Sequence, residues 1–125
     1  MGVTFTTVQV SNPRSPGEDA RAVEALVDTG AIYSVVPRAT LEGLGIRPMG
    51  RESFTLADGT HKRYAVGEAF FRLGKKSGTS KVVFGPRGAT PLLGALTLES
   101  LGLMVNPVTR ELAPMRLILA GVLRA

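Results

Sequence analysis

Residues 25–31 read Ala25-Leu26-Val27-Asp28-Thr29-Gly30-Ala31 and place a carboxylate directly after an apolar run. A charged group at the end of a buried strand is costly unless it is paired or has a chemical role. The preceding residues 21–27 are predicted to form a strand. Residues 32–36 are mostly β-branched or aromatic and stop at a proline, which predicts a second strand. We therefore expect the acid on a tight turn between two apolar strands.

Two residues after Asp28 have properties that suit such a turn. Gly30 allows a sharp bend or the close approach of another backbone, and the Thr29 hydroxyl can hold the turn in place. A second stretch, Pro91-Leu92-Leu93-Gly94-Ala95-Leu96, partly repeats the first and is followed by a predicted short helix over residues 97–101. Such an echo is expected if two β-units are related by internal pseudosymmetry.

On these two stretches the chain resembles the retropepsin-type (clan AA) aspartic proteases, the single-domain relatives of pepsin. The matched parts span about residues 20–112. The resemblance implies a mostly β fold, the closed β-barrel of the acid proteases with one or two short helices, assembled as a homodimer. It also implies an aspartic endopeptidase that acts on a peptide or protein substrate and needs no cofactor or metal.

The resemblance assigns roles to individual residues of the Asp28 turn. Asp28 would be the catalytic acid, and Thr29 would hydrogen-bond to its own counterpart across the dimer. Gly30 would let the substrate backbone come close. Ala31 would contact substrate and stands where pepsin-like enzymes often have a hydroxyl. Because a hydroxyl there would stabilise the charged acid, we expect a working pH that is mildly acidic to neutral, and an optimum below about 3 would contradict this.

The flap, a hairpin that closes over bound peptide in this family, is predicted at residues 53–61. Its tip residues Ala57, Asp58 and Gly59 are candidate substrate contacts, and Asp58-Gly59 favours a two-residue turn. Flap tips in the family are often rich in glycine, whereas this one is short and charged. A purely structural hairpin is the alternative.

Aspartic proteolysis requires two neighbouring carboxylates that share one proton, so that one activates water while the other protonates the scissile carbonyl. The chain contains three aspartates, and only Asp28 is followed by Thr-Gly; Asp19 lies in a polar loop and Asp58 in the hairpin turn. Either two copies each supply Asp28 across a two-fold axis, or the chain is not a protease. A catalytically inactive peptide-binding or dimerisation module of the same fold, and an unrelated β-barrel with a chance match, are the alternatives.

Composition agrees with one domain over residues 1–125. The 44% hydrophobic content is enough for a single core, and without cysteine neither a disulfide nor a thiolate site is available. His61 is the only histidine, so a zinc site or a histidine-based triad is not expected. No apolar stretch approaches the length of a membrane span and no signal peptide is apparent, which predicts a cytoplasmic protein without membrane contact.

The net charge of +5 comes from eleven arginines and four lysines against ten acids. These basic residues are scattered, so we expect no nucleic-acid partner, while a preference for acidic substrate segments remains open. Further strands are predicted at residues 3–10, 53–57, 61–66, 70–73, 79–84 and 103–105, and a helix at 37–44. The apolar tail at residues 115–123 is either a dimer interface or a core strand.

Overall fold

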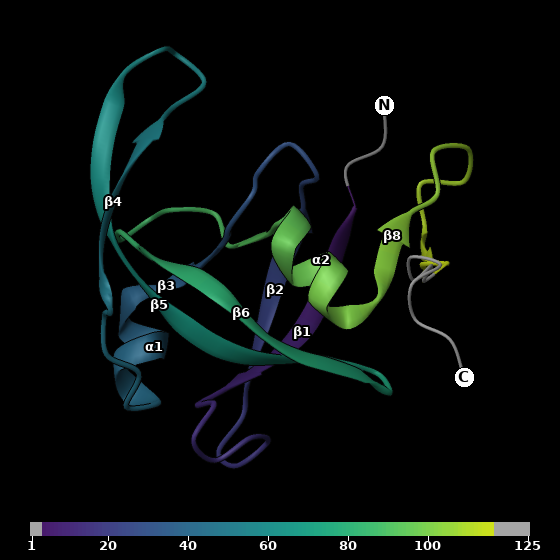
Figure 1. The fold of residues 1–125 in the computed structure, drawn as a ribbon, viewed down its shortest axis with the longest axis horizontal. Coiled ribbons are helices and arrows are strands. Elements are labelled where there is room, and N and C mark those ends of the chain that lie inside the picture. Colours follow the sequence, from purple (N-terminus) through teal and green to yellow (C-terminus); the bar gives the residue numbers. More distant parts are fainter. Residues whose placement is uncertain (1–3, 117–125) are drawn as a thin grey trace, which may run out of the picture.

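The computed structural model describes residues 4–116, which form a mostly β structure with two short helices (Figure 1). In chain order the elements are β1 (Phe5–Ser11), β2 (Arg21–Val27), β3 (Ser34–Pro37), α1 (Arg38–Gly43), β4 (Gly50–Thr55), β5 (His61–Leu73), β6 (Lys76–Gly85), β7 (Leu92–Leu93), α2 (Ala95–Leu101), β8 (Leu103–Val105) and β9 (Leu112–Pro114). The β4–β5 hairpin projects from one side of the molecule, opposite β8 (Figure 1).

One sheet contains seven of these strands in the order β1-β2-β7-β3-β6-β5-β4, and β1 additionally pairs with β5. The short strand β7 lies between β2, to which it is parallel, and β3, to which it is antiparallel. Its position brings two segments more than sixty residues apart in the sequence to the same place. A second, two-stranded sheet joins β8 and β9.

The core is formed by the inner face of the sheet together with side chains of both helices. In strand β1, Val8 and Val10 are buried whereas Thr7 and Gln9 are exposed, as expected for a strand with one face in the interior. Phe71 of β5 and Phe84 of β6 are the largest fully buried side chains. Helix α2 packs on β6, β5 and β3 and buries Leu98.

Strand β2 and the two helices are where the sequence predicts them, within a few residues at their ends. Three expectations were wrong in detail. The strand before Pro37 starts at Ser34, because the backbone of Ile32 bends to accept a hydrogen bond from Leu96 at the start of α2. Strand β5 is continuous over His61–Leu73, and its hairpin with β6 closes on two residues rather than five, since Leu73 pairs with Lys76.

Within residues 4–116 the structure has no helix that is both long and apolar enough to cross a membrane. The predicted tail at residues 115–123 falls largely outside the described residues. Only its first two positions are described, where the Met115 amide donates to the carbonyl of Gly102 at 2.7 Å. The choice between interface and core strand therefore stays a prediction.

Candidate active site

Asp28 follows the last residue of β2 and is half-buried, while Thr29 and Gly30 are exposed. Its carboxylate Oδ1 accepts a hydrogen bond from the Gly30 amide at 2.9 Å, and its carbonyl accepts one from the Ala31 amide at 3.1 Å. These two bonds form the tight turn that the sequence predicts. The backbone at Gly30 does not have positive φ, and a Cβ there would lie 3.2 Å from Asp28 Oδ1.

The second predicted stretch lies directly beside this turn. Leu26 pairs with Leu92 and Val27 with Leu93 in parallel register, and the Asp28 amide donates to the Leu93 carbonyl at 3.0 Å. The start of α2 then donates back, with the Ala95 amide bonded to the Ala31 carbonyl at 2.8 Å. The residues on both sides of the Asp28 carboxylate are thus held by main-chain hydrogen bonds, which fixes the direction of the acid.

Gly94 lies in close contact with the backbone that follows the Asp28 turn. A Cβ at this position would lie 2.7 Å from the backbone C and O atoms of Tyr33, a distance that real Cβ atoms do not adopt. Any residue can adopt the φ of Gly94, which is −92°. Glycine is needed here because only a residue without a side chain permits this close contact.

We predict that Gly94→Ala lowers the free energy of unfolding by about 2–3 kcal/mol, because backbone rather than a flexible side chain must move. Urea denaturation measures the change. Gly50→Ala is the matched control: an added Cβ at Gly50 meets nothing within 4 Å, so this variant should stay within about 0.5 kcal/mol of wild type. Equal effects of the two substitutions would contradict the packing argument.

A chain of buried hydroxyl groups lies beneath the turn and was not predicted from the sequence. Ser34 Oγ accepts from the Gly94 amide at 2.9 Å and hydrogen-bonds to Thr97 Oγ1, which donates to Ser80 Oγ at 3.1 Å. Ser34 and Thr97 are fully buried. The available signal was a hydroxyl residue at an otherwise apolar position of a strand and of a helix; such groups require partners when buried.

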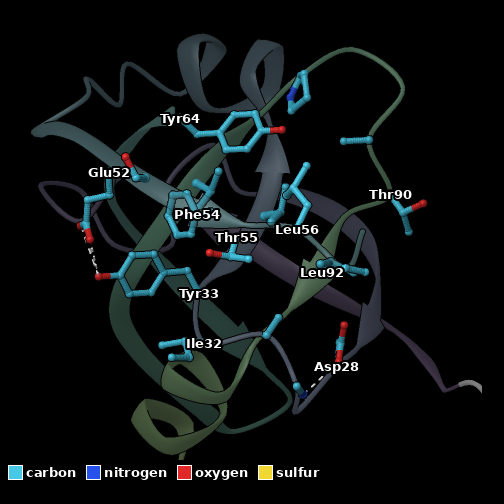
Figure 2. A pocket seen from close by; sticks show the side chains of 18 residues that line it. Asp28, Ile32, Tyr33, Glu52, Phe54, Thr55, Leu56, Tyr64, Thr90 and Leu92 are labelled. Carbon is cyan, nitrogen blue, oxygen red and sulfur yellow. Dashed lines mark hydrogen bonds between the residues drawn. The ribbon is translucent and has the colours of Figure 1, made fainter. Parts of the chain in front are cut away.

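A groove of about 840 Å³ opens over Asp28 (Figure 2). It is lined by the turn and the strand after it, by β4 and the first hairpin residues, by parts of β5 and β6, and by the segment leading to β7. The lining residues are 28, 30–33, 35, 52–57, 64, 83, 86, 89, 90 and 92. Most of them are apolar or aromatic, which is typical of a site that binds an organic ligand or a peptide side chain.

The comparisons with known proteins agree with this geometry. A family model described as aspartyl protease matches residues 8–107, most of the chain and both stretches of the site. The chain belongs to the aspartyl protease family. No curated protein sequence matches it. Among solved structures, the solution structure of simian foamy virus (mac) protease is similar, with a TM-score of 0.50 and 20% identity over 75% of this chain and 92% of that chain. At that identity the likeness concerns the fold.

In this member of the aspartyl protease family, the structure brings together Asp28, Gly30, Ala31 and Ala57 on the walls of the groove. Thr29 and the tip residues Asp58 and Gly59 are not among the lining residues of the single chain. Ile32, which sequence reasoning did not select, also lines the groove and is 67% exposed. An exposed large apolar side chain beside the acid is a signal that only the structure provides.

The hairpin that we assigned as the flap is formed by β4 and β5. Residues 56–60 connect the two strands. The Gly59 amide donates to the Leu56 carbonyl, and the Leu56 amide donates to the Thr60 carbonyl, so that this last bond encloses a turn of three residues rather than the expected two. Gly59 has φ of +86°, as the last position of such a turn requires. Asp58 Oδ1 accepts from the Thr60 hydroxyl at 2.6 Å and from the Thr60 amide at 3.0 Å.

The Thr60 hydroxyl, followed by the Thr60 amide, lowers the pKa of the Asp58 carboxyl below its ordinary value. A lowered pKa means that the charged acid orders the tip at pH values above the unfolded pKa of about 3.9, and that this order is lost as pH falls through the folded pKa. We expect the amide NMR signal of Thr60 to titrate with a midpoint below about 3.9. Asp58→Asn should abolish the titration, and a midpoint above the ordinary value would contradict the assignment.

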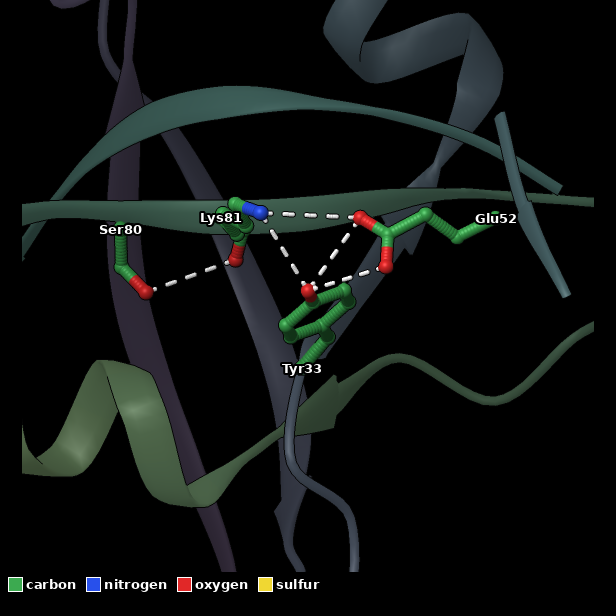
Figure 3. Close-up of polar contacts among 4 residues, drawn as sticks. All are labelled: Tyr33, Glu52, Ser80 and Lys81. Atoms are coloured by element: carbon green, nitrogen blue, oxygen red, sulfur yellow. Dashed lines mark hydrogen bonds and ion pairs between the residues drawn. The ribbon is translucent and has the colours of Figure 1, made fainter. Parts of the chain in front are cut away.

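A polar cluster at the far end of the groove was also not predicted (Figure 3). The Tyr33 hydroxyl donates to the Glu52 carboxylate, 3.2 Å from each oxygen, and Lys81 Nζ lies 3.6 Å from Glu52 Oε2. Lys81 also donates to the Tyr33 hydroxyl at 3.4 Å, and this hydrogen bond raises the pKa of the lysine. We name these three residues the Glu52 cluster.

Among residues 4–116, no group of three or more His, Asp or Glu side chains is placed to hold a metal ion. His61 instead hydrogen-bonds through Nδ1 to the hydroxyl of Thr55 at 3.0 Å, across the base of the hairpin turn. Its position fits a structural role in the hairpin.

Proposed function

We propose that the chain is a homodimeric aspartic endopeptidase in which two Asp28 carboxylates, one from each subunit, activate a water molecule. The proposal rests on one observation: the carboxylate of Asp28, held on its turn by the Gly30 amide, lines an apolar groove. Peptide would lie between the floor and the β4–β5 hairpin, with its main chain bonded to both. The additional β1–β5 pairing supports the closed barrel of this fold.

The carboxylates that line the groove support the dimer. Among the described lining residues the carboxylates are Asp28 and Glu52, and Figure 2 shows them on different sides of the groove. Glu52 is already engaged by Tyr33 and Lys81. The second acid that the reaction requires is therefore best supplied by another copy of Asp28.

Exposed apolar side chains next to the turn are a suitable surface for this contact. The Val27 amide donates to the Thr4 carbonyl at 2.8 Å, so the start of β1 lies beside Asp28, and Phe5 there is 52% exposed. The Thr4 hydroxyl also bonds to the carbonyl of Arg110, and Val108 in the same turn is 87% exposed. A two-fold axis near this surface would bury Phe5 and Val108 and bring the Asp28 turns of the two subunits together.

In the reaction, the ionised carboxylate of the pair accepts a proton from water while the protonated one donates to the scissile carbonyl oxygen. Water oxygen bonds to the carbonyl carbon to give a tetrahedral intermediate, with no covalent bond to the protein. Return of a proton to the amide nitrogen then breaks the C–N bond. The hydrogen bond from Gly30 would favour the charged member of the pair.

The test is cleavage of a mixed peptide library by the wild-type chain from about pH 3 to about pH 8, with the oligomeric state measured in the same buffers. Cleavage by a dimer supports the proposal. An intact dimer that binds peptides but cleaves none would instead support the catalytically inactive peptide-binding module. A strict monomer at high concentration would contradict the two-subunit site.

A further inference from the structure

The walls of the groove differ in charge from the rest of the chain. The chain carries a net charge of +5, yet none of the described lining residues is Arg, Lys or His, and the two charged ones are acids. Asp28 serves the proposed reaction, which leaves Glu52 as the charge that a substrate side chain would meet. A groove of this sign disfavours an acidic substrate side chain and favours a cationic one.

Aromatic rings form the path to Glu52. Tyr33 and Phe54 pack edge to face with ring centroids 5.6 Å apart, and Phe54 contacts Tyr64 at 6.1 Å. All three rings line the groove, and Figure 2 shows Tyr33 on the same side as Glu52. Rings of this kind bind both alkyl stems and the planar guanidinium group.

Glu52 retains capacity for a further partner. A carboxylate offers about four acceptor positions, whereas the Tyr33 hydroxyl supplies one hydrogen that is shared between the two oxygens. Lys81 contributes an ion pair to one carboxylate oxygen, Oε2, at 3.6 Å and also donates a hydrogen bond to the Tyr33 hydroxyl. The Glu52 side chain is 42% exposed, and Figure 3 shows the Tyr33 hydroxyl pointing toward its carboxylate.

We propose that the Glu52 cluster and the adjacent rings form a subsite for a substrate arginine, whose stem crosses the aromatic wall and whose guanidinium binds Glu52. This inference rests on the proposed endopeptidase function and names a substrate preference for the same groove. In a two-fold dimer the subsite occurs once on each side of the scissile bond. Lys81 competes with the substrate for Glu52 and thereby limits the preference.

The experiment compares peptides that differ at one position, which holds either arginine or citrulline, its neutral isostere. Starting from a peptide that the wild-type dimer cleaves, each position is varied in turn and kcat/KM is measured. We expect arginine to be favoured about five- to ten-fold at one position on each side of the bond. Glu52→Gln should bring the ratio close to one, and Lys81→Met should increase it.

Glu42→Gln is the matched control, because Glu42 is exposed on α1, pairs with Arg38 at 3.4 Å, and removing its charge changes the net charge equally. Its arginine-to-citrulline ratio should equal that of wild type. A wild-type ratio near one at every position, or a ratio unchanged in Glu52→Gln, would overturn the subsite.

Binding separates this inference from the proposed function. Fluorescence anisotropy of labelled library peptides that carry either arginine or citrulline, chosen without regard to cleavage, is measured on Asp28→Asn with and without Glu52→Gln and reports the subsite without catalysis. Arginine-dependent binding without cleavage by wild type would refute the peptidase and retain the subsite. Cleavage that is indifferent to Glu52 would retain the peptidase and refute the subsite.

Discussion

Asp28→Asn is expected to lower kcat/KM by about 10³-fold or more at every pH at which the wild type cleaves peptide. Asparagine has nearly the same shape, and its side-chain oxygen still accepts the hydrogen bond that the Gly30 amide donates at 2.9 Å. The side-chain amide of the new asparagine cannot take a proton from water or share one with the opposing carboxylate. The loss should therefore appear in kcat, whereas peptide binding is preserved.

The control for this loss is Asp19→Asn. Asp19 is exposed in the loop between β1 and β2 and has φ of +52°, a conformation that asparagine tolerates. Its kcat/KM should match wild type, and both variants should unfold within a few degrees of the parent. Activity of Asp28→Asn above about 10% of wild type would show that the acid is not the catalytic group.

The second large effect concerns mixed dimers. If each site contains two copies of Asp28, wild-type chains that exchange with a nine-fold excess of Asp28→Asn chains should lose about nine tenths of their activity, since most are then paired with an inactive copy. Chains that act independently would keep full activity in the same mixture. The measurement is the cleavage rate per wild-type chain after subunit exchange.

A matched mixture with Asp19→Asn controls for dilution and exchange, and its rate should not fall, because that variant retains the acid of the turn. Two results together would contradict the shared site. One is a wild-type rate that stays proportional to protein concentration over the range in which the dimer dissociates, and the other is an excess of Asp28→Asn chains that leaves the wild-type rate unchanged. The two results are independent of which peptide is used as substrate.

Much of the fold and the center of the site could be predicted from local sequence. The strand before Asp28, the turn after it and the first helix follow from apolar runs, turn residues and proline positions over fewer than ten neighbours. The Leu92-Leu93-Gly94 stretch and the helix after it were predicted from the resemblance to the aspartic proteases. The β4–β5 hairpin was predicted as well, but its turn gained one residue. The hydrogen bond from the Leu56 amide to the Thr60 carbonyl determines the length of the turn, and the preference of the Asp58-Gly59 dipeptide does not predict it.

Contacts across the sheet were not predictable in this way. The Glu52 cluster joins β4, β6 and the bend before β3, and the buried hydroxyl chain joins Ser34 to Thr97, 63 residues away. Their geometry depends on strand register, in which a shift of one residue turns every side chain to the other face. The local sequence of one strand does not specify its register with a neighbouring strand.

The sequence by itself determined the acid, its turn and the mainly β class, because each depends on residues adjacent in the chain. The tertiary structure decided what surrounds the acid: the parallel pairing of β2 with β7, the close approach at Gly94 and the aromatic wall that ends at Glu52. These features depend on how distant strands align as the core excludes water. Local preference therefore placed Asp28 on its turn, and packing gave it a groove with a charge and a shape.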